Sequence, residues 1–189
     1  MAKLKNLEDF LMDELKDLYS AEKQLTKALP KMAKAASSPE LQEAFTNHLK
    51  ETEGQIKRLD KISKLAGGRS LSGKKCKAME GLIEEGKELM EEDASPEVMD
   101  VALICAAQKV EHYEIASYGC AATYARLLGY NEVEALLNET LEEEKGADEK
   151  LSSIAGELNE EAMNPEGEDD EEMDAKKKSP KSSKNKKRK

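Results

Sequence analysis

Apolar residues near the start of the chain recur at alternating intervals of four and three residues, which places them on one face of an α-helix. Residues 7–36 show this spacing most clearly, and the stripe contains one acid, Glu22, at its centre. The stripe reads Leu11, Leu15, Leu18, Glu22, Leu25, Leu29 and Met32. We therefore predict a long amphipathic helix that turns one glutamate toward the same side as six apolar residues.

A second helix is predicted over residues 38–66, where Ser38 and Pro39 supply an N-cap and a first-turn proline. Its stripe is apolar at both ends and polar in the middle. The positions are Leu41, Phe45, His48, Thr52, Gln55, Leu59 and Ile62. The two helices together are predicted to form a hairpin.

The same hairpin design recurs 92 residues further along the chain. Another Ser-Pro-Glu start signal predicts a helix over residues 96–128, and a last helix is predicted over 132–158. After the shift, the inward stripes of the two hairpins coincide, and the stripe of the third helix then includes Ser117 and Tyr124. The folded part is thus predicted to be two copies of one helical unit.

The connection between the hairpins, residues 67–95, is longer than a tight turn and contains a short helical pattern between Met79 and Met90. A connection of this kind allows the second and third long helices to run in the same direction. We predict an all-α fold, a ferritin-like four-helix bundle with a long crossover containing a short extra helix.

Composition indicates one helical domain over residues 1–159, because 37% of the chain is charged and only 4% is aromatic. Residues 160–189 carry nine acids followed by nine bases with few apolar residues, and we predict that this tail is disordered. The two halves of the tail cancel, so the net charge of −10 belongs to the bundle. That charge argues against nonspecific nucleic-acid binding by the folded part.

We expect a cytoplasmic protein that does not enter a membrane. The three cysteines, at positions 76, 105 and 120, lack the spacing of a metal site and are expected to be reduced thiols. The N-terminal segment has no apolar core of the secretory type, and no apolar run approaches the ~18 residues of a membrane span.

Four glutamates occupy equivalent places in the two hairpins. The shift of 92 residues superimposes Glu22 on Glu114, and it also superimposes Glu51 on Glu143. In each hairpin 29 residues separate the two acids, which brings them to nearly the same level of the bundle. Buried acids are costly unless cations compensate their charge, and carboxylate oxygens suit Fe(II) and Mn(II). We predict a buried site for two Fe or Mn ions, with Glu22 and Glu114 as terminal ligands. Glu51 and Glu143 would bridge the ions.

The usual second ligand of such a site is missing. Di-iron carboxylate proteins carry Glu-x-x-His motifs, yet Gly54 and Gly146 stand three residues after the two bridging glutamates. Other donors lie within about one and a half turns of the four acids and are candidate additional ligands. They are the nitrogen donor His48 and the oxygen donors Gln55, Glu111, Glu144 and Asp148.

Each candidate also has a purely structural interpretation. Glu22 and Glu114 could form buried ion pairs or face a groove. Glu51 could belong to a solvated flank, and His48 could be a hydrogen-bonded core histidine. The tyrosines of the third helix are most simply packing residues, with an electron relay as the alternative.

Four blocks of the sequence resemble the bacterial YciE/YciF family of ferritin-like proteins, over roughly residues 5–158. The blocks are DELKDLYSAEKQLTKALPKM, NHLKETEGQIKRL, KVEHYEIASYGCAATYARLLG and LNETLEEEKGADEKL. The resemblance implies a ferritin-like bundle with a crossover helix, a di-iron or related dimetal centre, a soluble homodimer and an association with general or osmotic stress. The acids of the family map onto Glu22, Glu51, Glu114 and Glu143, while the missing histidines depart from the di-iron pattern.

Two functions from different classes follow. The first is a ferritin-like protein that oxidises Fe(II) with O₂ or peroxide and needs no catalytic residue separate from its metal ligands. The second is a noncatalytic stress protein or scaffold whose basic residues 176–189 bind nucleic acid or another anionic surface. In a third interpretation, the chain is a helical interaction module whose glutamates are solvated.

Overall fold

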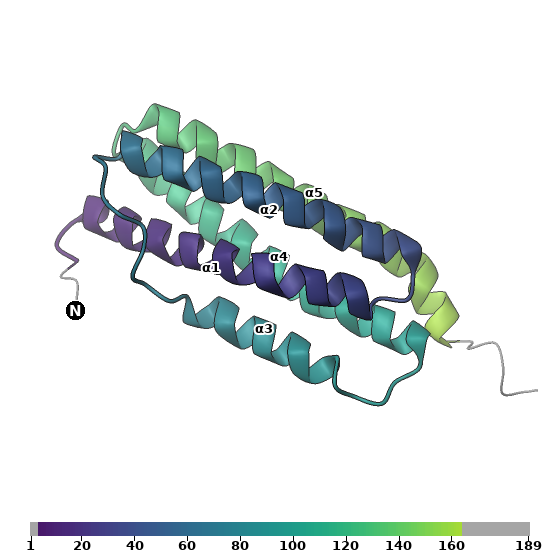
Figure 1. Cartoon of the computed structure of the whole chain (residues 1–189). Helices are drawn as coiled ribbons and strands as arrows, with labels where there is room; N and C mark the ends of the chain where they lie inside the picture. The colour runs from purple at the N-terminus through teal and green to yellow at the C-terminus, as the bar shows by residue number, and fades with distance from the viewer. Residues whose placement is uncertain (1–3, 164–189) are drawn as a thin grey trace, which may run out of the picture.

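The computed structural model describes residues 4–163, which form five α-helices aligned along one long axis (Figure 1). The helices are α1 (Leu7–Ala35), α2 (Pro39–Leu65), α3 (Lys77–Leu89), α4 (Pro96–Leu127) and α5 (Asn131–Met163). No strand occurs among the described residues. The all-α prediction is confirmed, and the first four helices begin and end within a few residues of their predicted bounds.

Side-chain caps fix where the helices begin. The hydroxyls of Ser38 and Ser95 accept backbone N–H groups in the first turns of α2 and α4, as the two start signals predict. A further contact ties these two helix starts together. The buried carboxylate of Asp100 on α4 accepts the N–H of Ser37 and the N–H of Ser38, each at 2.7 Å. The N-terminus of α2 is therefore anchored to the other hairpin.

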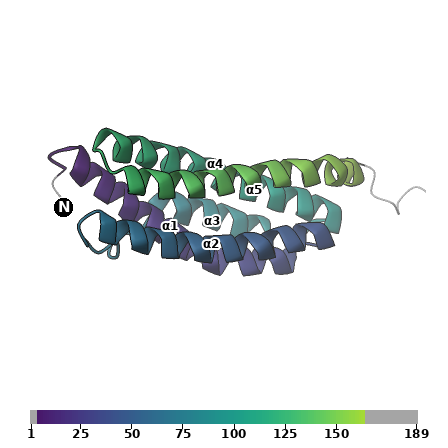
Figure 2. The same ribbon diagram turned by 90° about the horizontal axis from the view of Figure 1, so that it is seen from above.

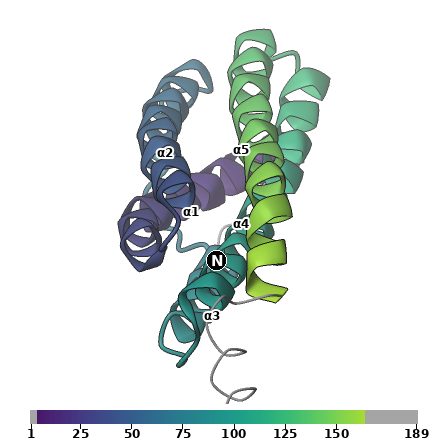
Figure 3. The same ribbon diagram turned by 90° about the vertical axis from the view of Figure 1, so that its right-hand side faces the viewer.

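The two predicted hairpins are present. Helices α1 and α2 pack as one pair and α4 and α5 as the other, which Figure 2 shows on opposite sides of the bundle. Helix α3 lies outside the four long helices, against α4 and α1 (Figure 3). The connection that contains α3 returns along the bundle, so that α2 and α4 run in the same direction (Figure 1). The predicted crossover is confirmed.

The core consists of two apolar clusters separated by a polar layer. One cluster includes Leu25 and Phe45, and the other includes Leu15 and Leu59. Between the two clusters, each long helix contributes polar side chains that are shielded from solvent. These are Glu22, His48, Thr52, Gln55, Glu111, Glu114, Thr140 and Glu144. The polar middle predicted for the second helix thus extends across all four.

The structure departs from the sequence prediction in two places. Helix α5 continues to Met163, beyond the predicted end at residue 158. On α4, Tyr118 is fully buried while Ser117 and Tyr124 of the predicted stripe are only partly buried. A repeat of four and three residues averages 3.5 per turn, and the buried face of a 3.6-residue helix drifts away from it. Contacts with α1, α3 and α5 also cover α4 on several sides.

Residues 160–163, which were predicted to belong to a disordered tail, form the last turn of α5. The rest of the predicted tail, residues 164–189, lies outside the described residues. Within residues 4–163, no helix combines the length and the apolar character that a membrane span requires.

Candidate metal centre

The polar layer brings ionisable side chains from all four long helices to one level of the bundle. Three of the candidates predicted from the sequence come from α1 and α4, namely Glu22, Glu111 and Glu114, and none is more than 2% exposed. Helix α2 contributes His48 at 7% exposure, and α5 contributes Glu144 at 0%. Each lies in the middle of its helix, where the apolar stripes above and below hold the layer away from both ends of the bundle.

Four of these residues form a compact cluster of potential ligands. His48, Glu111, Glu114 and Glu144 each offer one donor atom, and the four atoms all lie within 4.8 Å of one another. The Nε2 atom of His48 is 3.5 Å from an oxygen of Glu111 and 3.7 Å from an oxygen of Glu144. Atoms at these separations can share one bound cation after small side-chain adjustments.

Hydrogen bonding leaves this layer incomplete. Among the described residues, seven buried side-chain atoms have no hydrogen-bond partner, and all seven belong to the layer. They are Glu22 Oε2, His48 Nε2, Gln55 Oε1, Glu111 Oε2, both carboxylate oxygens of Glu114 and Glu144 Oε2. Buried polar atoms are nearly always paired, so a concentration of unpaired acceptors requires an explanation. Carboxylate oxygens with an imidazole nitrogen are a donor set that Fe(II), Mn(II) or Zn(II) accepts, and the residues therefore fit a metal ion.

Two neutral side chains hold the acids in place. The phenol of Tyr118, fully buried on α4, donates a hydrogen bond to Glu22 Oε1. On the opposite side, Gln55 Nε2 donates to Glu144 Oε1 at 2.5 Å. Each bond occupies one oxygen and leaves the other oxygen of the same carboxylate unpaired. Gln55, predicted as an oxygen donor to metal, thus contacts the acids through its amide nitrogen.

Burial raises the pKa of every acid in the cluster. Loss of solvent is the main cause, and repulsion from neighbouring carboxylates adds to it, so the pKa of Glu22 rises to about 8. Burial also raises the pKa of Glu111 to about 8. The pKa values of Glu114 and Glu144 lie well above 4.5 for the same reasons. Burial alone would lower the pKa of His48, but the surrounding carboxylates raise it. A bound cation would favour the ionised form of these acids and would lower their pKa values together.

The two glutamates predicted as bridging ligands lie at the margin of the layer. The Glu51 side chain is 50% exposed, and Oε2 lies 3.3 Å from His48 Nδ1. The Glu143 side chain is 30% exposed and forms an ion pair with Arg58 at 2.7 Å. Glu144 is the buried acid of α5 instead. Adjacent residues of a helix differ by about 100° in direction, so Glu143 and Glu144 face different sides of α5.

The remaining candidate, Asp148, lies outside the cluster. It accepts a hydrogen bond from Gln108 Nε2 at 3.2 Å and lies 3.4 Å from the exposed ring of His112. Its oxygens therefore face α4 near the surface. At Gly54 and Gly146, where the di-iron motif carries histidine, a Cβ atom would meet nothing within 4 Å.

Sequence patterns did not identify Arg58 as part of the site, and they offered Tyr118 only as a packing residue or an electron relay, not as a hydrogen-bond donor to Glu22. Arg58 donates to both oxygens of Glu143 and also to the hydroxyl of Thr140 at 2.7 Å. The sequence signal for Arg58 would have been a basic residue three positions after Gln55, on the same helix. For Tyr118 the only signal was its four-residue spacing from Glu114.

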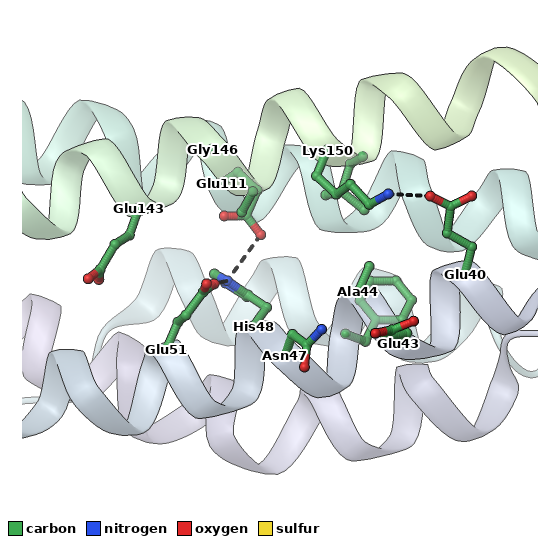
Figure 4. A pocket seen from close by; sticks show the side chains of 13 residues that line it. Glu40, Glu43, Ala44, Asn47, His48, Glu51, Glu111, Glu143, Gly146 and Lys150 are labelled. Atoms are coloured by element: carbon green, nitrogen blue, oxygen red, sulfur yellow. Dashed lines mark hydrogen bonds and ion pairs between the residues drawn. The ribbon is translucent and has the colours of Figure 1, made fainter.

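A cavity of about 370 Å³ connects the cluster with the surface between α2 and α5 (Figure 4). His48 and Glu111 lie at its inner side, and Glu51 and Glu143 lie nearer the surface. Gly146 also lines the cavity. The buried cluster is therefore reachable from one face of the bundle.

Comparison with known proteins shows where similar chains occur. The sequence model described as "Domain of unknown function (DUF892)" matches residues 6–164. Protein YciF of Escherichia coli (strain K12) is 54% identical over 152 residues, which is 80% of this chain and 92% of that protein. The crystal structure of the E. coli stress protein YciF superimposes with a TM-score of 0.81 and 52% identity, covering 82% of this chain and 98% of that one. YcfI from Rhodopseudomonas palustris superimposes with a TM-score of 0.78 and 44% identity, covering 80% and 96%.

Proposed function

The chain belongs to the DUF892 family and is a homologue of the stress protein YciF, and we propose that it is a ferritin-like dimetal-carboxylate protein. Its activity would be the oxidation of Fe(II) with O₂ or peroxide during a bacterial stress response. One observation carries the proposal, namely the concentration of unpaired buried acceptors in a single layer of the bundle. A layer of this kind is costly in the absence of a cation and becomes stabilising once a cation is bound.

The buried residues would hold the metal ions. Glu22 and Glu114 approach from α1 and α4, and Glu144 approaches from α5. His48 and Glu111 provide a nitrogen and an oxygen close to the cavity. Bound iron would supply one-electron chemistry and an open coordination position for the oxidant. Two Fe or Mn ions are the content proposed for this ligand set.

The protein's own part is orientation and the exclusion of water. Tyr118 and Gln55 each fix one oxygen of a neighbouring carboxylate, so that the second oxygen points into the cluster. The apolar clusters above and below limit solvent access to the side cavity. Electrostatic interactions are stronger in such a dry site, and negative carboxylates favour the more highly charged Fe(III) product over Fe(II).

A cytoplasmic homodimer is part of the proposal. No disulfide bond joins any of the three cysteines, Cys76, Cys105 and Cys120, which is consistent with a reducing compartment. The homologous protein of E. coli is named as a stress protein, which supports the proposed role in a stress response. Nucleic-acid contact through residues 176–189 stays a prediction and belongs to the noncatalytic alternative.

Iron titration tests the proposal directly. Full-length protein freed of metal should oxidise Fe(II) faster than buffer does, and elemental analysis should find retained Fe or Mn. Glu22→Ala and Glu114→Ala should lower both readings, whereas Glu84→Gln, at an exposed position of α3, should change neither. If the unaltered protein neither retains metal nor exceeds the buffer rate, the ferroxidase proposal is refuted and the helical scaffold remains.

A further inference from the structure

Acidic side chains predominate in the lining of the cavity between α2 and α5. Five carboxylates line it, against a single lysine, Lys150. That lysine forms an ion pair with Glu40 at the end of the cavity away from Glu143 (Figure 4). Glu43 and Glu51 lie along the wall with exposed side chains, and Glu51 is 3.3 Å from His48 Nδ1. Glu143 is partly exposed and shares its charge with Arg58, which is not part of the lining. A recess lined mainly by one sign of charge concentrates counterions of the opposite sign.

The inner side of the cavity presents unpaired ligand atoms. His48 is 7% exposed and Glu111 is 2% exposed, and both line the cavity. Neither His48 Nε2 nor Glu111 Oε2 has a hydrogen-bond partner. The cavity therefore leads from exposed acids to buried donors that are prepared to receive a cation.

A glycine keeps the mouth of the cavity open. Gly146 lies within α5, where glycine is less favourable than alanine by roughly 0.5–1 kcal/mol. No tight packing requires glycine at this position, since an added Cβ atom would meet nothing within 4 Å. A longer side chain at residue 146 would instead occupy part of the cavity that Gly146 lines.

We propose that this cavity is the route by which a hydrated divalent metal ion enters the buried cluster. Glu51 and Glu143 capture the ion at the mouth, and His48 and Glu111 receive it at the inner end. The inference rests on the proposed function, because it assumes that the cluster binds metal. In this proposal Glu51 and Glu143 determine how fast the metal binds, whereas the buried residues determine how much metal is bound.

Rapid mixing of metal-free, full-length protein with Co(II) tests the capture role through cobalt absorbance. The double variant Glu51→Gln/Glu143→Gln should bind cobalt about tenfold more slowly at low ionic strength and reach the same final content. The difference should shrink at high salt, because screening shortens the range of the exposed charges. The matched control Glu84→Gln/Glu88→Gln removes two exposed acids from α3 and should keep the original rate.

A second pair of variants tests the path itself. Gly146→Leu should slow cobalt binding, whereas Gly54→Leu, at a helix position outside the cavity lining, should not. Equal rates for the unaltered protein and both mouth variants would overturn the route. A lower final content at an unchanged rate would make Glu51 and Glu143 ligands and would overturn the capture role. Cobalt binding by a protein that fails to oxidise iron would refute the ferroxidase proposal alone.

Discussion

Replacing Glu114 with glutamine is expected to stabilise the metal-free protein at pH 8 and to weaken its response to metal. Both Glu114 oxygens are buried and unpaired, next to three other acids. Glutamine has nearly the same size, carries no charge, and its amide group can donate hydrogen bonds to neighbouring carboxylates. The substitution therefore removes charge repulsion and one desolvated charge from the site in metal-free protein. It also removes a proposed metal ligand.

The size of the effect follows from linkage between protonation and folding. Burial and neighbouring acids raise the folded-state pKa of Glu114 well above 4.5. Protonation therefore favours the fold, and this contribution is complete below the unfolded-state pKa and is lost as pH rises toward the folded-state value. Each pH unit in that window corresponds to about 1.4 kcal/mol. Both Glu114 oxygens are buried without partners, and an unsatisfied buried polar group costs about 1–3 kcal/mol, so we expect a gain of that order at pH 8.

Chemical and thermal unfolding followed by far-ultraviolet circular dichroism in the presence of a chelator would measure this gain. Glu114→Gln should match the unaltered protein near pH 5 and exceed it at pH 8, with a melting temperature higher by roughly 2–12 °C. Added Mn(II) should stabilise the unaltered protein more than the variant. Equal or lower stability of the variant at pH 8 would refute the conclusion that Glu114 is an uncompensated buried acid, and Glu84→Gln serves as the control.

Three further substitutions test individual contacts. Asp100→Ala should lower the free energy of unfolding by about 1–3 kcal/mol in urea titrations, because two backbone N–H groups lose their acceptor. Tyr118→Phe should lower it by a similar ~1–3 kcal/mol in metal-free protein, since Glu22 loses its donor. Glu144→Gln should reduce the metal content found by elemental analysis, whereas its neighbour variant Glu143→Gln should retain it. Unchanged stability or equal metal contents would contradict these assignments.

The helices and their order were predictable because local rules determine them. The spacing of apolar residues, the two Ser-Pro starts and the length of the crossover each depend on neighbouring positions only. The repeat of 92 residues then placed Glu22 and Glu114 at equivalent depths, and the structure buries both. The level of the polar layer in the bundle can therefore be predicted from the repeat alone, without tertiary contacts.

The choice of the inward glutamate on the last helix was harder to predict, although the apolar stripe of that helix passes through Glu144. Three consecutive glutamates, 142 to 144, occur where the stripe crosses the layer, and adjacent positions differ by about 100°. A contact from another helix distinguishes them, because Arg58 on α2 pairs with Glu143 at the surface while Glu144 turns inward. The hydrogen bond from Tyr118 to Glu22 was not predicted for a similar reason, since it depends on the packing of α4 against α1. Distant contacts of this kind leave no periodic signal.

The polar layer that divides the core also divides the bundle into two ends. Leu25 and Phe45 belong to one apolar cluster and Leu15 and Leu59 to the other, and each cluster draws residues from all four long helices. A cation held between His48 and acids of the opposite hairpin would fasten the two repeats together at mid-height. Metal content would then govern how far local opening at one end spreads to the other, so hydrogen exchange at the two ends should become coupled as the ion binds.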